Sequence, residues 1–145
     1  MAKSLLLEVV TPDRLVIGQD VASVTAAGTA GAFTVLPQHI PFLTSLAVGY
    51  LSFRVDGVVH TVFVSGGFAD VTFDKVLILA EAAELPDEID VDRAKRARER
   101  AEARLTLERR EHIDYVRARS ALERAVMRIR LHELGISGLG LHPGA

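Results

Sequence analysis

The pattern of apolar residues changes once along the chain, close to Pro86. Before it, short segments rich in β-branched and aromatic residues alternate with turn residues, as in 21–27, 51–55, 58–64 and 75–80. After it, Ala, Arg and Glu predominate, which favours helices. The sequence therefore predicts an α+β protein with an antiparallel β-sandwich over 1–85. A two-helix antiparallel hairpin follows over 86–134, and a flexible tail over 135–145.

Turn residues support the sandwich. Asp56-Gly57 separates two strand-like segments and is the pair that a type I′ hairpin turn favours. Further turns are predicted at residues 65–67 (Ser-Gly-Gly) and 73–75 (Phe-Asp-Lys). The segment VLPQHIPFLTSL, residues 35–46, contains two prolines that a central strand excludes, so it is predicted to be an ordered loop with packed apolar side chains.

The helices are predicted over 90–107 and 111–134, with a short link over 108–111 and Gly135 ending the second helix. The second helix has an apolar face formed by Tyr115, Ala118, Leu122, Ala125 and Ile129. The face of the first is mostly alanine: Ala94, Ala97 and Ala101, with Leu105. Since alanine buries little area, the hairpin is expected to pack weakly and to move.

Several kinds of chemistry find no support in the sequence. The chain has no cysteine, which excludes disulfides and thiolate catalysis. Its five histidines show no metal-binding spacing, Ser65 lacks a nucleophile-elbow motif, and no glycine-rich phosphate loop occurs. The net charge of −2 gives no reason to expect nucleic-acid binding. No segment is long and apolar enough to cross a membrane, so a soluble, cytoplasmic protein is expected.

The segment EIDVDRA, residues 88–94, permits two interpretations. In the first, Asp90 is an N-cap, and the arginines that follow are solvated or pair with glutamates. In the second, residues on one face of each helix bind a polyphosphate, because guanidinium groups match phosphate oxygens. That candidate set joins the cap to arginines of both helices: Asp90, Arg93, Arg100, Arg117, Arg124 and Arg128.

Three motifs occur together in a fixed order: GTAGAFTVLPQHIPFLTSL, VSGGFADV and IDVDRA. With them the chain resembles the epsilon subunit of bacterial F-type ATP synthase over residues 4 to about 134. The resemblance implies a non-catalytic rotor subunit that couples the catalytic head to the c-ring. It also implies that the helical hairpin extends toward the alpha and beta subunits to inhibit ATP hydrolysis.

The resemblance assigns further roles. The implied partners are the gamma subunit, the c-ring and the alpha and beta subunits, with Pro37, His39 and Pro41 at or near the ring. For His39, the alternative is an ordered loop residue bonded to a backbone carbonyl. Ile89, Asp90, Arg93 and Ala94 match the [I/L]DxxRA motif that binds ATP in some members. No cofactor is required, regulatory ATP is expected to bind, and the need for Mg²⁺ stays open.

The implied location is the cytoplasmic face of the inner or plasma membrane, as a peripheral protein. One functional alternative from another class remains. In it, the chain is a free-standing ligand-binding β-sandwich with the helices as a lid.

Overall fold

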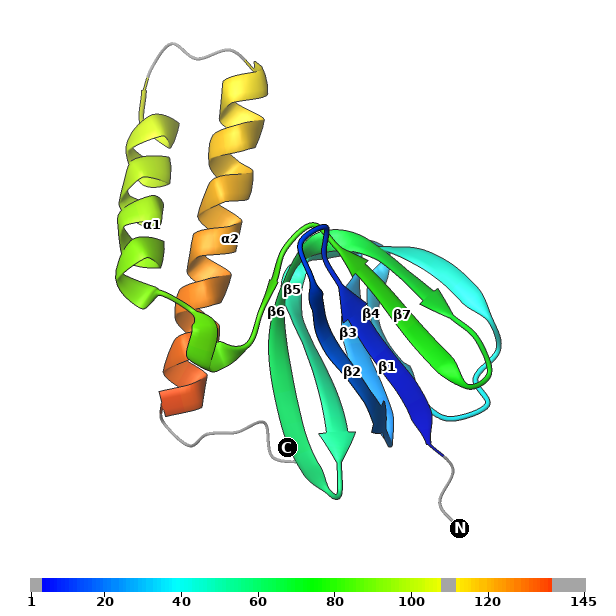
Figure 1. Cartoon of the computed structure of the whole chain (residues 1–145). Coiled ribbons are helices and arrows are strands. Elements are labelled where there is room, and N and C mark those ends of the chain that lie inside the picture. The colour runs from blue at the N-terminus through cyan, green and yellow to red at the C-terminus, as the bar shows by residue number, and fades with distance from the viewer. Residues whose placement is uncertain (1–3, 108–111, 137–145) are drawn as a thin grey trace.

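The computed structural model describes residues 4–107 and 112–136 and places a strand-rich body beside two antiparallel helices (Figure 1). The described strands are β1 (Leu5–Val10), β2 (Leu15–Val21), β3 (Ser23–Gly28), β4 (Gly31–Val35), β5 (Phe42–Val55), β6 (Val58–Val71), β7 (Lys75–Ala80) and β8 (Ala83–Glu84). A 3₁₀ turn, η1 (Pro86–Glu88), leads to α1 (Val91–Leu105) and α2 (His112–Ile136). This order of elements confirms the predicted fold class.

The two longest strands, β5 and β6, connect the layers of the sandwich. They pair along their whole length, and the strand order is β2-β1-β7-β6-β5-β3-β4, with β8 also on β6. All the pairs are antiparallel except β1 with β7. The β5–β6 turn has positive φ at both Asp56 (51°) and Gly57 (79°), as the predicted type I′ turn requires.

The prediction of a turn at residues 65–67 is wrong. Strand β6 continues through this segment, and Gly67 pairs with Leu46 on one side and Ala80 on the other. Gly67 has φ 121°, and a Cβ added there would lie 2.0 Å from the carbonyl oxygen of Leu79. The glycines therefore allow a close approach of strands inside the sheet, which the sequence alone does not distinguish from a chain reversal.

The predicted loop over 35–46 is shorter in the structure. Val35 ends β4 and Phe42 begins β5, so the irregular segment covers residues 36–41 only. Pro41 immediately precedes β5, where a missing backbone donor is tolerated. The apolar run after it forms the first part of a long strand.

The sandwich has its own core, built from alternate residues of its strands. Leu5, Leu7 and Val9 of β1 are fully buried, as are Val76 and Ile78 of β7. This alternation is the expected result of placing one face of each strand against the other layer. The core is complete without the helices.

The helices pack against each other through small residues and against the sandwich through α2. Ala94 and Ala101 of α1 and Ala118 and Ala125 of α2 are buried. Between the hairpin and the sandwich lies a separate apolar group, called here the docking cluster: Phe63, Ile89 and Leu131, with Val48, Tyr50 and Met127 partly buried around them. The burial of Ala94 and Ala101 on the first helix, and of Ala118, Ala125 and Ile129 on the second, agrees with the predicted faces. Weak packing of the hairpin stays a prediction.

The limits of the helices differ slightly from those predicted. Helix α2 continues through Gly135 to Ile136, so Gly135 does not end it. Glycine is tolerated in a helix at a cost of about 1 kcal/mol, and a single glycine is therefore an unreliable stop signal. The predicted tail covered 135–145, but residues 135 and 136 belong to α2. The predicted link over 108–111 and the rest of the tail, 137–145, lie outside the described residues.

Candidate functional site

A cleft of about 390 Å³ lies between the two helices and the segment that joins them to the sandwich. It is lined by residues from three places: Glu84 and Glu88 before α1; Asp90, Arg93, Ala94, Ala97 and Arg100 at or on α1; and Ala121, Arg124 and Arg128 on α2. Charged side chains surround a floor of alanines. Because alanine stops at Cβ, the space between the helices stays open.

Most of the predicted binding residues meet in this cleft. Asp90, Arg93, Ala94, Arg100, Arg124 and Arg128 all line it. Ile89 is instead buried in the docking cluster, at 5% exposure. Arg117 is exposed on α2 and does not line the cleft. Helical spacing thus predicted correctly which residues share a face of each helix. It did not predict that the cleft reaches Arg124 and Arg128 on α2 but not Arg117.

Asp90 fixes the start of α1. Its Oδ1 accepts a hydrogen bond from the backbone N–H of Arg93 at 3.0 Å, so the N-cap interpretation is correct. The cap sets the helical phase in which Arg93 and Arg100 lie on the face of Asp90. The same carboxylate lines the cleft, so capping and a place in the candidate site do not exclude each other.

Arg128 connects the cleft to the sandwich. Its Nε donates to Glu84 Oε1 at 3.0 Å, and its Nη2 lies 2.9 Å from the same oxygen. The guanidinium carbon also lies 4.5 Å from the ring centroid of Phe63. Both partners belong to the sandwich, whereas Arg128 belongs to α2. Arg128 therefore contributes to docking of the hairpin as well as lining the cleft.

Glu88 forms an ion pair with a residue near the N-terminus of the chain. Arg14, in the turn between β1 and β2, binds both carboxylate oxygens of Glu88, with Nη1 to Oε1 at 3.3 Å. By this hydrogen bonding, Arg14 holds the pKa of Glu88 below its usual value. The sequence analysis did not identify Glu84 and Glu88 as site residues. Their partners, Arg128 and Arg14, lie 44 and 74 residues away along the chain, and periodic spacing shows only which residues of a single helix or strand share a face.

The remaining cations of the cleft have no acidic partner. Among the described residues, no ion pair engages Arg93, Arg100 or Arg124. Glu84 and Glu88 are each neutralised by an arginine, which leaves Asp90 as the only lining carboxylate without one in this part of the chain. The cleft is consequently suited to an anionic ligand with several oxygens.

The predicted contact loop, residues 36–41, is ordered by backbone bonds. Gln38 N–H donates to the carbonyl of Phe73 at 2.8 Å, and Gln38 adopts φ 68°. His39 is half-buried, with its ring 5.2 Å from that of Phe42 and its Nδ1 2.7 Å from the carbonyl oxygen of Ile40. This bond agrees with the carbonyl-bonded interpretation of His39, and a contact of His39 with the ring stays a prediction.

The loop region exposes several large apolar side chains. Ile40 is 76% exposed, and Leu36, Leu43 and Phe73 are also largely exposed. Pro41 is exposed, whereas Pro37 is half-buried. The sequence predicted Pro37, His39 and Pro41 as contact residues, and their apolar neighbours Leu36, Ile40 and Leu43 are largely exposed beside them. The two prolines shape the loop that presents them.

Both parts of the chain match the same protein family. Residues 4–86 match the family described as "ATP synthase, Delta/Epsilon chain, beta-sandwich domain", and residues 87–133 match "ATP synthase, Delta/Epsilon chain, long alpha-helix domain". The chain belongs to the ATP synthase epsilon-chain family. The epsilon chain of Nitratidesulfovibrio vulgaris (strain DP4) is 56% identical over 105 residues, which cover 72% of this chain and 78% of that one. The epsilon chain of Syntrophobacter fumaroxidans is 52% identical over the same shares.

Solved structures agree with this family membership. A chain in "Cryo-EM structure of Euglena gracilis mitochondrial ATP synthase, OSCP/F1/c-ring in rotational state 1" superposes with a TM-score of 0.75 at 25% identity, over 92% of this chain and 81% of that one. A chain of the Tetrahymena thermophila mitochondrial ATP synthase central stalk shares the fold, with a TM-score of 0.64 at 14% identity. This epsilon chain is thus a non-catalytic stalk subunit of ATP synthase.

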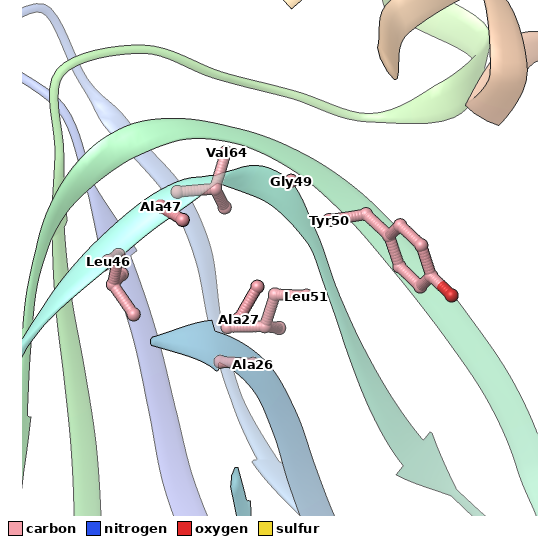
Figure 2. Close-up of a pocket in the computed structure, with 8 residues that line it drawn as sticks. All are labelled: Ala26, Ala27, Leu46, Ala47, Gly49, Tyr50, Leu51 and Val64. Carbon is pink, nitrogen blue, oxygen red and sulfur yellow. The ribbon is translucent and has the colours of Figure 1, made fainter. Parts of the chain in front are cut away.

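A pocket in the sandwich of the epsilon chain bears on the alternative function. It lies between β3 and β5, is lined mainly by small and aliphatic residues, and has a volume of about 10 Å³ (Figure 2). That is room for about one water molecule, not for an organic ligand. The family membership disfavours a free-standing ligand-binding sandwich. No helix within residues 4–107 and 112–136 is long and apolar enough to cross a membrane.

Proposed function

We propose that this epsilon chain links the catalytic head of ATP synthase to the c-ring and regulates ATP hydrolysis through a hairpin that binds ATP in the cleft. Its partners are then the gamma subunit, the c-ring and the alpha and beta subunits. It lies at the cytoplasmic face of the membrane as a peripheral subunit. The observation that carries the regulatory part is the cleft itself, with three unpaired arginines contributed by both helices.

The size and charge of the cleft fit a nucleoside triphosphate. A volume of about 390 Å³ lies within the range of small-molecule sites, roughly 300–1,000 Å³. Arg93 and Arg100 approach from α1 and Arg124 from α2. A triphosphate between them bridges the two helices and neutralises three like charges that otherwise repel one another. Whether Mg²⁺ enters with it stays open.

The hairpin is built as an element that a ligand can shift. Its contact with the sandwich comprises the docking cluster and the Arg128–Glu84 pair, and the sandwich core does not depend on it. Such a limited contact allows a docked and an undocked arrangement that differ by a few kcal/mol. ATP binds between helices held in the docked arrangement and stabilises it. The undocked hairpin is then the form that reaches the alpha and beta subunits and inhibits hydrolysis.

The loop over residues 36–41 supports the coupling part of the proposal. It presents Leu36 and Ile40 to solvent at one end of the sandwich, with Leu43 and Phe73 nearby. Clustered exposed apolar side chains are typical of a protein interface. We assign this surface to the c-ring, with His39, Pro37 and Pro41 holding its shape.

Calorimetry on the full chain tests ATP binding. The unmodified protein is expected to bind ATP with measurable heat at or below millimolar concentration. Replacing one free guanidinium, as in Arg124→Ala, is expected to weaken binding by about 10- to 150-fold, because a charge-assisted hydrogen bond contributes about 1.5–3 kcal/mol. Arg119→Ala is the matched control, since Arg119 lies on α2 outside the cleft and pairs with Glu123. Absence of heat with the unmodified chain at millimolar ATP contradicts the proposal.

A further inference from the structure

The negative charge of Glu88 opposes the binding of an anionic ligand in the cleft. Its carboxylate lines the cleft that contains the three unpaired arginines. Without a positive partner, this carboxylate repels phosphate oxygens bound in the same cleft, because like charges that lie close together interact strongly. The cleft can favour a polyphosphate only if this charge is offset.

Arg14 supplies the compensating charge from outside the cleft. Its guanidinium binds both oxygens of Glu88, and Arg14 is not among the residues that line the cleft. A two-point pairing of this kind fixes the direction of both side chains. The negative charge of Glu88 is thus paired with a positive charge at the edge of the cleft.

The backbone around each partner is also fixed. Arg14 N–H donates to Thr11 Oγ1 at 3.3 Å, and Thr11 N–H donates to the Arg14 carbonyl at 2.9 Å. On the other side, Glu88 N–H donates to the Leu85 carbonyl at 3.0 Å, and Leu85 N–H donates to Glu88 Oε2 at 3.4 Å. The pair therefore joins two ordered turns, one in the sandwich and one at the base of the hairpin.

We propose that Arg14 is a positioning residue for ligand binding: it neutralises Glu88 and so makes the cleft accept a polyphosphate. This inference rests on the proposed binding of ATP. It makes the sandwich a contributor to the affinity of a site formed otherwise by the helices and their linker. It also restricts full affinity to the docked arrangement, because Arg14 meets Glu88 only when η1 lies against the β1–β2 turn.

The lowered pKa of Glu88 is consistent with this role. Hydrogen bonding to Arg14 lowers the pKa of the carboxylate below its usual value, so Glu88 is ionised and its charge needs compensation at neutral pH. Removing Arg14 then leaves a full negative charge at the edge of the cleft.

Three variants of the full chain test the proposal by calorimetry with ATP at pH 7 and low salt. Arg14→Gln is expected to weaken binding by about threefold to tenfold, since one unpaired charge then faces the ligand in a partly solvated site. Glu88→Gln is expected to bind at least as tightly as the unmodified chain. The double variant is expected to lie within about twofold of Glu88→Gln, because no carboxylate remains to repel the ligand.

Recovery of ATP binding in the double variant distinguishes charge compensation by Arg14 from a purely structural role of Arg14. The single Arg14→Gln and the double variant both lack the ion pair, so loss of a structural contact weakens binding equally in the two. Arg119→Gln, which removes an exposed arginine on α2 outside the cleft, controls for a general loss of positive charge.

Each negative result has its own meaning. Unchanged binding in Arg14→Gln, weaker binding in Glu88→Gln, or no rescue in the double variant overturns the inference while ATP binding stands. If the unmodified chain does not bind ATP, the proposed function itself fails. If Arg14→Gln does not fold, Glu88→Gln still decides, because the proposal forbids a loss of affinity there.

Discussion

Replacing Leu131 with alanine should separate the stability of the hairpin from that of the sandwich. Leu131 is 1% exposed on α2 and belongs to the docking cluster with Phe63 and Ile89. None of these three belongs to the sandwich core. The substitution therefore removes buried carbon from the contact between hairpin and sandwich, and it leaves the core of the sandwich intact.

The magnitude follows from the atoms removed. Leu→Ala deletes three carbon groups, worth about 0.8 kcal/mol each, so the transfer cost is about 2.4 kcal/mol. A cavity usually adds to this, but a contact between two units can close by a small shift, so we expect about 2–3 kcal/mol. Alanine is the better helix former, and intrinsic helix propensity therefore does not contribute to the loss.

Hydrogen exchange measures the two parts of the chain separately. If protection of the hairpin depends on docking, amides of α1 and α2 should exchange about 30- to 150-fold faster, because 1.4 kcal/mol corresponds to a factor of ten. Amides of β1 and β7 should keep their rates. Val126→Ala, at an exposed site on the same helix, is the control and should leave both sets of rates nearly unchanged.

Two outcomes contradict this reasoning. Unchanged exchange in the helices means that the docking cluster does not stabilise the hairpin. An equal increase in the strands of the sandwich means that the chain unfolds as one unit and that the hairpin has no independent equilibrium. The second outcome also removes the basis for a hairpin that a ligand can shift.

Three further predictions follow from other parts of the molecule. Gly67→Ala should lower the free energy of unfolding in urea by about 2–4 kcal/mol, because its Cβ has no room beside the Leu79 carbonyl; a loss below about 0.5 kcal/mol contradicts this. Glu88→Gln should be less stable than the unmodified chain above about pH 5. This difference should disappear as the pH falls through the lowered pKa of Glu88, since the ionised form is the one that Arg14 stabilises. A difference that grows in acid has the wrong sign. Ile40→Asp should weaken attachment to the c-ring in reconstituted synthase and leave thermal unfolding unchanged, with Val58→Asp, exposed in the β5–β6 hairpin, as the control. Equal pull-down of the ring by both variants counts against that surface.

Local physical rules account for most of the fold that the sequence predicts. Asp56-Gly57 specifies the β5–β6 hairpin because few other pairs adopt positive φ twice. Asp90 specifies the start of α1 because its side chain satisfies a free backbone N–H. In both cases the determining interactions lie within four residues. The sequence carries all the information needed there.

Other features depend on partners that are distant along the chain. Gly67 resembles a turn residue in the sequence, and only the approach of β7 shows that it serves a strand. Arg14 and Glu88 belong to segments with no visible relation until the sheet brings the β1–β2 turn against η1. Periodicity places residues on a face of one element, and it contains no information on which face of another element lies opposite.

The four residues of the motif Ile89, Asp90, Arg93 and Ala94 have four separate structural roles. Ile89 is buried in the docking cluster and Asp90 caps α1, so these two fix the position and the phase of the helix. Ala94 is buried at the helix contact, and Arg93 presents a positive charge to the cleft. The motif therefore encodes a docked geometry as much as a ligand contact, because a guanidinium group binds well only where its direction is fixed in advance. On this view, a change at Ile89 that never touches a ligand should still lower affinity, by lowering the fraction of chains in the docked arrangement.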